Sequence, residues 1–160
     1  MRFTYLKVFA FIAILVIVQG CGDDTPDPPQ KTAEELAVEA LTGTGSLTWE
    51  TSGGGTVKRD GVLVTDNFQN FELTLSSTSS KTYTSRNSNE LFDASGTWSF
   101  AGSSFNKFIL SGVKPAAGRE ISFTRNADNL KLIFTISAPG ARINGTFAVA
   151  GTYEFDLLKK

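Results

Sequence analysis

Apolar and polar side chains alternate with a period of two along most of this 160-residue chain, beginning after Gly45. A period of two is typical of β-strands that bury one face and expose the other. Strands are indicated around Leu47 and Trp49, Val62 and Val64, Phe71 to Leu75, Tyr83, Trp98 and Phe100, Phe108 to Leu110, Ile121 and Phe123, Leu130 to Ile136, and from Ile143 through Phe147 and Val149 to Tyr153, Phe155 and Leu157. Strands with one apolar face must close or stack to bury it, so the chain is predicted to be all-β.

Short breaks rich in turn residues separate these strands. They include Gly53-Gly54-Gly55, which is predicted to be a hairpin turn, and Pro139-Gly140. About eight to ten short strands with short connections indicate an antiparallel meander. A meander that starts with one helix fits a closed barrel, which also removes exposed strand edges. A two-sheet sandwich is the alternative.

One short helix is predicted ahead of the strands. Thr32-Ala33-Glu34-Glu35 has the form of a capping box, in which Thr32 caps the amide of Glu35 and Glu35 reaches back. Apolar residues follow at helical spacing up to Leu41, and Gly43 ends the helix. The predicted helix is about ten residues long, a usual length for a globular protein.

The N-terminal segment combines a positive start, an apolar run and the single cysteine. Arg2 and Lys7 precede an unbroken apolar run over residues 8–18, which suits a signal peptide and is too short to span a bilayer. The small residue Gly20 followed by Cys21 resembles the lipobox of bacterial lipoproteins. The resemblance implies a signal peptide over residues 1–20, cleavage before Cys21 and acylation of Cys21, which anchors the protein in a membrane. An ordinary secretory signal with a chance cysteine is the alternative.

Residues 21–31 are predicted to be the lipidated cysteine and a flexible tether. The segment carries three prolines and no apolar side chain after the cysteine. An extended chain of about 3.1 Å per residue would hold the domain, residues 32–160, roughly 30 Å from its anchor. Gly22-Asp23-Asp24 is similar to the surface-export signal of Bacteroidota lipoproteins, with a solvated tether as the other interpretation. The expected location is the outer membrane, on its periplasmic face or at the cell surface.

Three short motifs between Gly45 and Lys159 resemble the lipocalin-like outer-membrane lipoproteins of Bacteroidota. They are Leu47-Thr48-Trp49, Gly96-Thr97-Trp98, and Gly151-Thr152-Tyr153-Glu154-Phe155-Asp156-Leu157. The resemblance implies a lipocalin-like barrel and an envelope location. It implies no particular activity.

The composition excludes several kinds of chemistry. The chain has no histidine and one cysteine, so it builds neither a Ser-His-Asp or Cys-His nucleophile nor a Cys/His zinc site. Beyond residue 20 it carries 13 basic and 16 acidic residues, a net charge of −3 that is no footprint for nucleic acid. Glycoside hydrolysis needs two carboxylates facing one cleft, and the candidates Asp60, Asp66, Glu90 and Asp93 lie in or near predicted loops. Loop carboxylates are usually just solvated, so we expect neither an enzyme nor a cofactor.

Aromatic residues on the predicted inner face are the candidates for binding. The interior of an eight-stranded barrel is filled by side chains or holds one small ligand. The candidate lining residues are Trp49, Phe71, Trp98, Phe100, Phe123, Phe134, Tyr153 and Phe155. The first hypothesis is a barrel that binds or carries a small apolar ligand. The alternative is a solid, non-catalytic scaffold or interaction module for an envelope protein or glycan.

Overall fold

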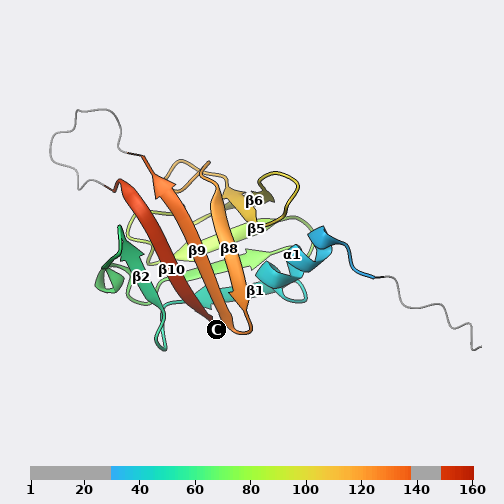
Figure 1. Ribbon diagram of the computed structural model, residues 1–160, viewed down its shortest axis with the longest axis horizontal. Coiled ribbons are helices and arrows are strands. Elements are labelled where there is room, and N and C mark those ends of the chain that lie inside the picture. Colours follow the sequence, from blue (N-terminus) through green and yellow to red (C-terminus); the bar gives the residue numbers. More distant parts are fainter. Residues whose placement is uncertain (1–29, 138–148) are drawn as a thin grey trace, which may run out of the picture. The chain divides into compact units, whose positions relative to one another are not determined.

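The structure, a computed structural model, describes residues 30–137 and 149–160 (Figure 1). These residues contain the helix α1 (Ala33–Thr42) and the short 3-10 helix η1 (Thr65–Phe68). The strands are β1 (Ser46–Glu50), β2 (Thr56–Arg59), β3 (Val62–Leu63), β4 (Glu72–Ser76), β5 (Thr82–Arg86), β6 (Ser95–Phe100), β7 (Lys107–Leu110), β8 (Ile121–Asn126), β9 (Asn129–Ile136) and β10 (Gly151–Lys159). The signal peptide, Cys21, most of the tether, Pro139-Gly140, Ile143 and Phe147 lie outside the described residues.

The strands close into an eight-stranded antiparallel barrel. β4 to β10 pair in chain order, and β1 pairs with β4 on one side and with β10 on the other. Trp49 of β1 lies opposite Lys159 of β10, and Glu50 lies opposite Leu158. Because the first and last strands are joined, the predicted all-β barrel with one preceding helix is confirmed, and the two-sheet sandwich is wrong.

The hairpin turn predicted at Gly53-Gly54-Gly55 is wrong. β1 and β2 run in the same direction and pair one after the other with β10, which is long enough to reach both. Residues 51–55 leave the sheet between Glu50, opposite Leu158, and Thr56, opposite Asp156. The segment is therefore an excursion between two strands, β1 and β2, that pair in turn with the same partner strand. β2 then turns into β3, where only Val62 of the expected Val62–Val64 pair is in a strand.

α1 forms as the sequence predicts. The Thr32 amide donates to the Glu35 carboxylate at 2.7 Å, and the Glu35 amide donates to the Thr32 hydroxyl at 3.2 Å. The Thr32 amide, and after it the Thr32 hydroxyl, lower the pKa of Glu35 by bonding to its ionised form. Gly43 ends the helix at a φ of 59°, which glycine adopts readily. Within the described part of the chain, no helix has the length and apolarity needed to cross a membrane.

Aromatic and aliphatic side chains from alternate strand positions fill the barrel. β9 shows this alternation most clearly, with Leu130, Leu132, Phe134 and Ile136 buried between more exposed neighbours. The core also contains five residues that the alternation did not indicate, namely Val57, Phe68, Leu91, Phe92 and Ala116. Phe68 comes from η1, and Leu91 and Phe92 come from the connection between β5 and β6. Irregular segments thus supply part of the packing at one end of the barrel.

Candidate functional site

One end of the barrel is closed by α1. Arg125 follows Ile121 and Phe123 on the inward side of β8, where an unpaired charge would be costly. Its Nη1 donates to the carbonyl oxygens of Glu39 at 3.0 Å and Ala40 at 3.2 Å, at the C-terminal end of α1. A cation is favourable there because the carbonyl groups of a helix end carry partial negative charge. Arg125 thereby ties α1 to the barrel wall.

Trp49 completes this closure. Its indole N–H donates to the carbonyl oxygen of Leu41 at 2.9 Å, and the Arg125 guanidinium lies 5.4 Å from its ring centroid. The Trp49 side chain is fully buried. The indole of Trp98 likewise donates to the carbonyl oxygen of Ser76, at 3.0 Å. Arg125 was not predicted from the sequence, although its period-two spacing from Phe123 placed it on an apolar face.

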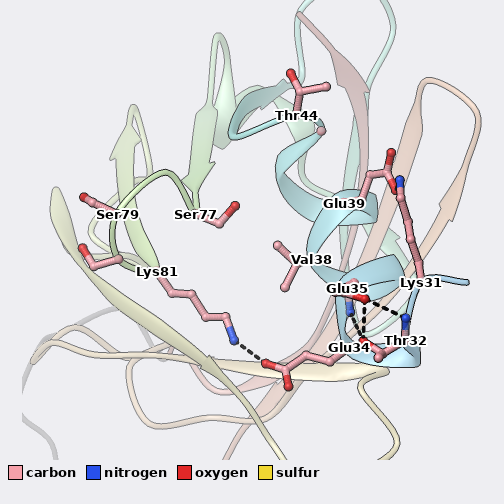
Figure 2. A pocket seen from close by; sticks show the side chains of 12 residues that line it. Lys31, Thr32, Glu34, Glu35, Val38, Glu39, Thr44, Ser77, Ser79 and Lys81 are labelled. Carbon is pink, nitrogen blue, oxygen red and sulfur yellow. Dashed lines mark hydrogen bonds and ion pairs between the residues drawn. The ribbon is translucent and has the colours of Figure 1, made fainter. Parts of the chain in front are cut away.

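A polar groove of 780 Å³ lies beside α1, between the helix and the connection from β4 to β5 (Figure 2). Figure 2 shows Lys81 reaching across it to Glu34, with the nitrogen and oxygen 2.7 Å apart. Lys31 pairs with Glu39 at 2.6 Å on the same helix. Val38 is the large apolar side chain in the lining, which otherwise consists of charged residues, serines, threonines and a glycine. The groove is larger than the pocket described next, but four of its charged side chains are engaged in ion pairs with one another.

A smaller pocket of 430 Å³ lies at the opposite end of the barrel, which we call the open end. The two sites lie at opposite ends of the β4–β5 hairpin. Ser77 and Lys81, in the connection between these strands, line the groove, whereas Phe68 before β4 and Asn89 after β5 line the pocket. The pocket is lined by Arg59, Val64, Asn67, Phe68, Asn89, Leu91, Val149 and Tyr153. Ligand pockets are commonly about 300–1,000 Å³, mostly apolar and with a few polar groups. The open-end pocket fits this description in both size and lining.

The floor of the pocket is aromatic. Phe68 of η1 and Tyr153 of β10 meet edge to face, with ring centroids 6.4 Å apart. The Tyr153 hydroxyl donates to the carbonyl oxygen of Val149 at 3.0 Å. The Thr51 hydroxyl donates to the carbonyl oxygen of Phe68 at 2.8 Å and holds the end of η1 against the excursion after β1. The rings are therefore held in place from two sides.

The wall of the pocket near Leu91 is held by Asp93. The Asp93 carboxylate accepts hydrogen bonds from the amides of Val113, at 3.0 Å, and Lys114, at 2.9 Å. The same connection returns to Leu91, whose carbonyl oxygen accepts from the Ala116 amide at 3.0 Å. Burial, followed by the charge of Asp93, raises the pKa of Tyr83 to about 12, so its hydroxyl stays neutral. These contacts fix the connection that carries Leu91.

The eight candidate lining residues fall into two groups of rings and one separate residue. Phe71, Phe134, Tyr153 and Phe155 share one group with Phe68 and Phe92, with centroids 5.2–6.4 Å apart. Trp98, Phe100 and Phe123 lie in a second group with Phe105 and Phe108. Trp49 lies under Arg125 at the closed end. Of the eight, only Tyr153 belongs to the lining of the open-end pocket.

Seven of the described residues in the pocket lining were not predicted from the sequence as lining residues. Phe68 and Leu91 lie in irregular segments, where alternation gives no signal, and Arg59 ends a strand with a single buried apolar residue. Tyr153 was found because it continues the alternation of β10. The pocket therefore arises where connections cover the end of the barrel, which a strand pattern does not report.

The acidic candidates are engaged with the main chain or with lysine. Asp60 accepts from the Thr152 amide at 2.8 Å, Asp93 holds the Val113 connection, and Glu90 pairs with Lys114. Asp66 lies in the first turn of η1. Among residues 30–137 and 149–160, no three His, Cys, Asp or Glu side chains gather in a way that could hold a metal ion.

Comparisons of the chain with protein-family models, with curated proteins and with solved structures find no match. The fold of the described residues is nevertheless a closed antiparallel barrel, compatible with a lipocalin-like architecture.

Proposed function

We propose that this protein is a lipid-anchored envelope protein whose barrel binds a small, partly apolar molecule at its open end. The observation that carries the proposal is the 430 Å³ pocket with Phe68 and Tyr153 as its aromatic floor. Aromatic rings offer apolar area in a fixed orientation, and the lining also supplies two amide side chains. A molecule bound there sits on the packed rings of the core instead of among them.

The closed end supports this choice of site. α1, Arg125 and Trp49 cover the other end through hydrogen bonds and ring contacts. The aromatic candidates between the two ends pack against one another at centroid distances usual for stacked and edge-to-face pairs. A ligand therefore has the least packing to displace at the open end.

A substitution that fills the pocket tests the proposal. Val64 lines the pocket and is partly exposed, so Val64→Trp adds an indole where the ligand would lie. The control is Val62→Trp on β3, because Val62 is 66% exposed and does not line the pocket. Each full-length protein is purified in the same way from an envelope extract and examined by native mass spectrometry. We expect a small-molecule adduct on the unsubstituted protein and on the Val62 variant, reduced at least tenfold on the Val64 variant.

Two results would contradict the proposed site. A bare protein mass in repeated extracts would argue against a carrier and favour the interaction module. An adduct that is equally abundant on all three proteins would place binding elsewhere. Circular dichroism of both variants checks that each remains folded.

The role proposed here is binding and not catalysis. Asp60, Glu90 and Asp93, three of the four carboxylates that suggested hydrolysis, are held by backbone amides or by a lysine. Asp60 and Asp93 thereby have clear structural roles. Among the described residues that line the open-end pocket, none carries a carboxylate.

Anchoring through Cys21 is a separate part of the proposal and has its own test. Acylation requires the thiol, so Cys21→Ala should abolish lipid attachment and release the protein from the membrane fraction. Metabolic labelling with a fatty-acid analogue and membrane fractionation measure the two effects. Membrane association that is unchanged in this variant would refute the lipoprotein assignment without touching the open-end pocket.

A further inference from the structure

We propose that the turn of residues 88–91, in the connection between β5 and β6, is a gate over the open-end pocket, and that the ion pair between Glu90 and Lys114 holds this gate closed. The inference rests on the proposed function and adds to it the route by which the ligand enters. It follows from how little of the apolar lining solvent reaches, how the turn is built and what holds it.

The apolar part of the described lining is almost closed to solvent. Phe68, Leu91 and Tyr153 line the pocket, yet their relative exposures are 3%, 1% and 3%. A ligand that packs against these side chains must therefore displace part of the protein when it enters.

The elements that carry the two rings are firmly held. Tyr153 lies in β10, which pairs with β9 on one side and with β2 on the other. Phe68 lies in η1, and its carbonyl oxygen accepts from the Thr51 hydroxyl at 2.8 Å and from the Phe71 amide at 3.1 Å. Leu91, in contrast, lies in an irregular connection outside the sheet. This connection can move while all the strand pairing stays intact.

The turn itself contains backbone strain. The Leu91 amide donates to the carbonyl oxygen of Ser88 at 3.0 Å, and the two central residues, Asn89 and Glu90, have φ values of 49° and 62°. Positive φ at both central positions is a property of type I′ turns, which favour Asn followed by Gly. Asn89 suits its position, whereas a glutamate at the second position costs free energy that a glycine would not. The turn therefore depends on contacts outside itself to stay in this conformation.

The connection between β7 and β8 supplies those contacts. Glu90 pairs with Lys114, and the carbonyl oxygen of Leu91 accepts from the Ala116 amide at 3.0 Å. The Glu90 side chain is 81% exposed, so water can take over its interactions when the turn moves away. The closed state is thus held by contacts that break at a small cost in free energy.

The chain is fixed on both sides of the turn. Before it, the side-chain amide of Asn87 donates to the carbonyl oxygen of Asn70 at 2.8 Å. After it, the Phe92 ring is 3% exposed and packs among the rings of the core. The Ser88 hydroxyl donates to the carbonyl oxygen of Phe92 at 2.9 Å, so the two ends of the turn stay together. Residues 88–91 can therefore swing outward as a unit and uncover the pocket without unfolding the barrel.

Amide hydrogen exchange of the full-length protein measures the opening. Glu90→Gln removes the pair with Lys114, and we expect the Ala116 amide to exchange about threefold faster, as suits the loss of an exposed ion pair. The matched control is Glu34→Gln, because Glu34 also pairs with a lysine, Lys81, in another segment, but at the closed end. The control should leave exchange at Ala116 unchanged. Thermal unfolding of each variant checks that the barrel remains folded.

A double variant assigns the effect to the ion pair. Lys114→Gln removes the same pair from its other side and should match Glu90→Gln. Combining the two substitutions should speed exchange no further, because the interaction is already lost in each single variant. Exchange at Ala116 that is unchanged in both single variants, or that increases additively in the double variant, would overturn the role of the pair.

A neutral aromatic probe, 2-naphthol, connects the opening to the pocket. Its binding to the full-length protein is followed by stopped-flow fluorescence, and Val64→Trp identifies the signal that comes from the open-end pocket. We expect Glu90→Gln to raise the association and dissociation rate constants by the same factor, about threefold, because the open state is more populated with and without the probe. Kd should stay within twofold, and Glu34→Gln should change neither rate constant.

Failure of the gate is distinguishable from failure of the proposed function. Binding that Val64→Trp abolishes, with rate constants unchanged in Glu90→Gln, would overturn the gate and keep the pocket. No binding of 2-naphthol, together with a bare mass from envelope extracts, would overturn both.

Discussion

Replacing Phe155 with alanine is expected to lower the free energy of unfolding by about 3–5 kcal/mol, the usual cost of removing a buried phenylalanine ring. Phe155 is fully buried in β10, and its ring lies 5.2 Å from the rings of Phe68 and Phe71. It also meets the rings of Phe92, at 5.7 Å, and Phe134, at 6.0 Å. These partners come from η1, β9 and two connections, so no single segment can move in to fill the space.

Urea unfolding, followed by the fluorescence of the buried Trp49 and Trp98, measures this loss. The matched control is Phe105→Ala, because Phe105 is partly exposed and meets the ring of Phe100 at 5.3 Å outside the group around Phe155. We expect the control to lose about 1 kcal/mol, consistent with incomplete burial. Equal losses in the two variants would contradict a core centred on Phe155.

Much of the fold could be predicted because alternation and capping are local signals. α1 begins after the capping box at Thr32 and ends at Gly43, as expected. The stripe from Leu130 to Ile136 became the buried side of β9, and the pairs at Trp49 and Trp98 lie in β1 and β6. Closure of the barrel could be predicted because strands with one apolar face must bury that face. The pairing of Trp49 with Lys159 decided between barrel and sandwich, and no local pattern encodes that long-range pair.

The candidate site was harder to predict for a physical reason. Its lining comes from strand ends and connections, where side-chain direction is set by tertiary contacts and not by a period. Phe68 points into the barrel because η1 is held by Thr51 and by the return of the chain at Phe71. Leu91 is buried through the Asp93 and Ala116 contacts. These contacts join residues up to 25 positions apart, beyond the reach of a local pattern.

The inward direction of Arg59 has a similar origin. Its strand has one buried apolar residue, Val57, so the pattern alone is too short to assign a face. The register with Tyr153 assigns it, and that register depends on where β2 resumes after the excursion at residues 51–55. The position of Arg59 in the pocket lining is therefore set by the length and path of that excursion.

Gly55→Ala is the second substitution with a large expected effect, because it blocks this excursion. A Cβ atom at Gly55 would lie 2.7 Å from the Cα atom of Thr51, and 2.9 Å from each of the carbonyl oxygens of Glu50 and Asp156. All three are backbone atoms of the barrel wall, so no side chain can rotate away to relieve the contact. The cost is expected to reach about 3 kcal/mol, the upper range for overpacking a tight site. Urea unfolding measures it.

Gly54→Ala adds the same methyl group one residue earlier and serves as the control. No atom lies within 4 Å of a Cβ there, and its cost comes from a φ of 119° alone, which we expect to amount to about 1–2 kcal/mol. If Gly55→Ala shifts β2 without unfolding the barrel, its register with β10 changes and Arg59 leaves its place opposite Tyr153. The small-molecule adduct should then be lost in Gly55→Ala while Gly54→Ala retains it. A Gly55 variant with unchanged stability and an unchanged adduct would show that the path of the excursion does not position the pocket.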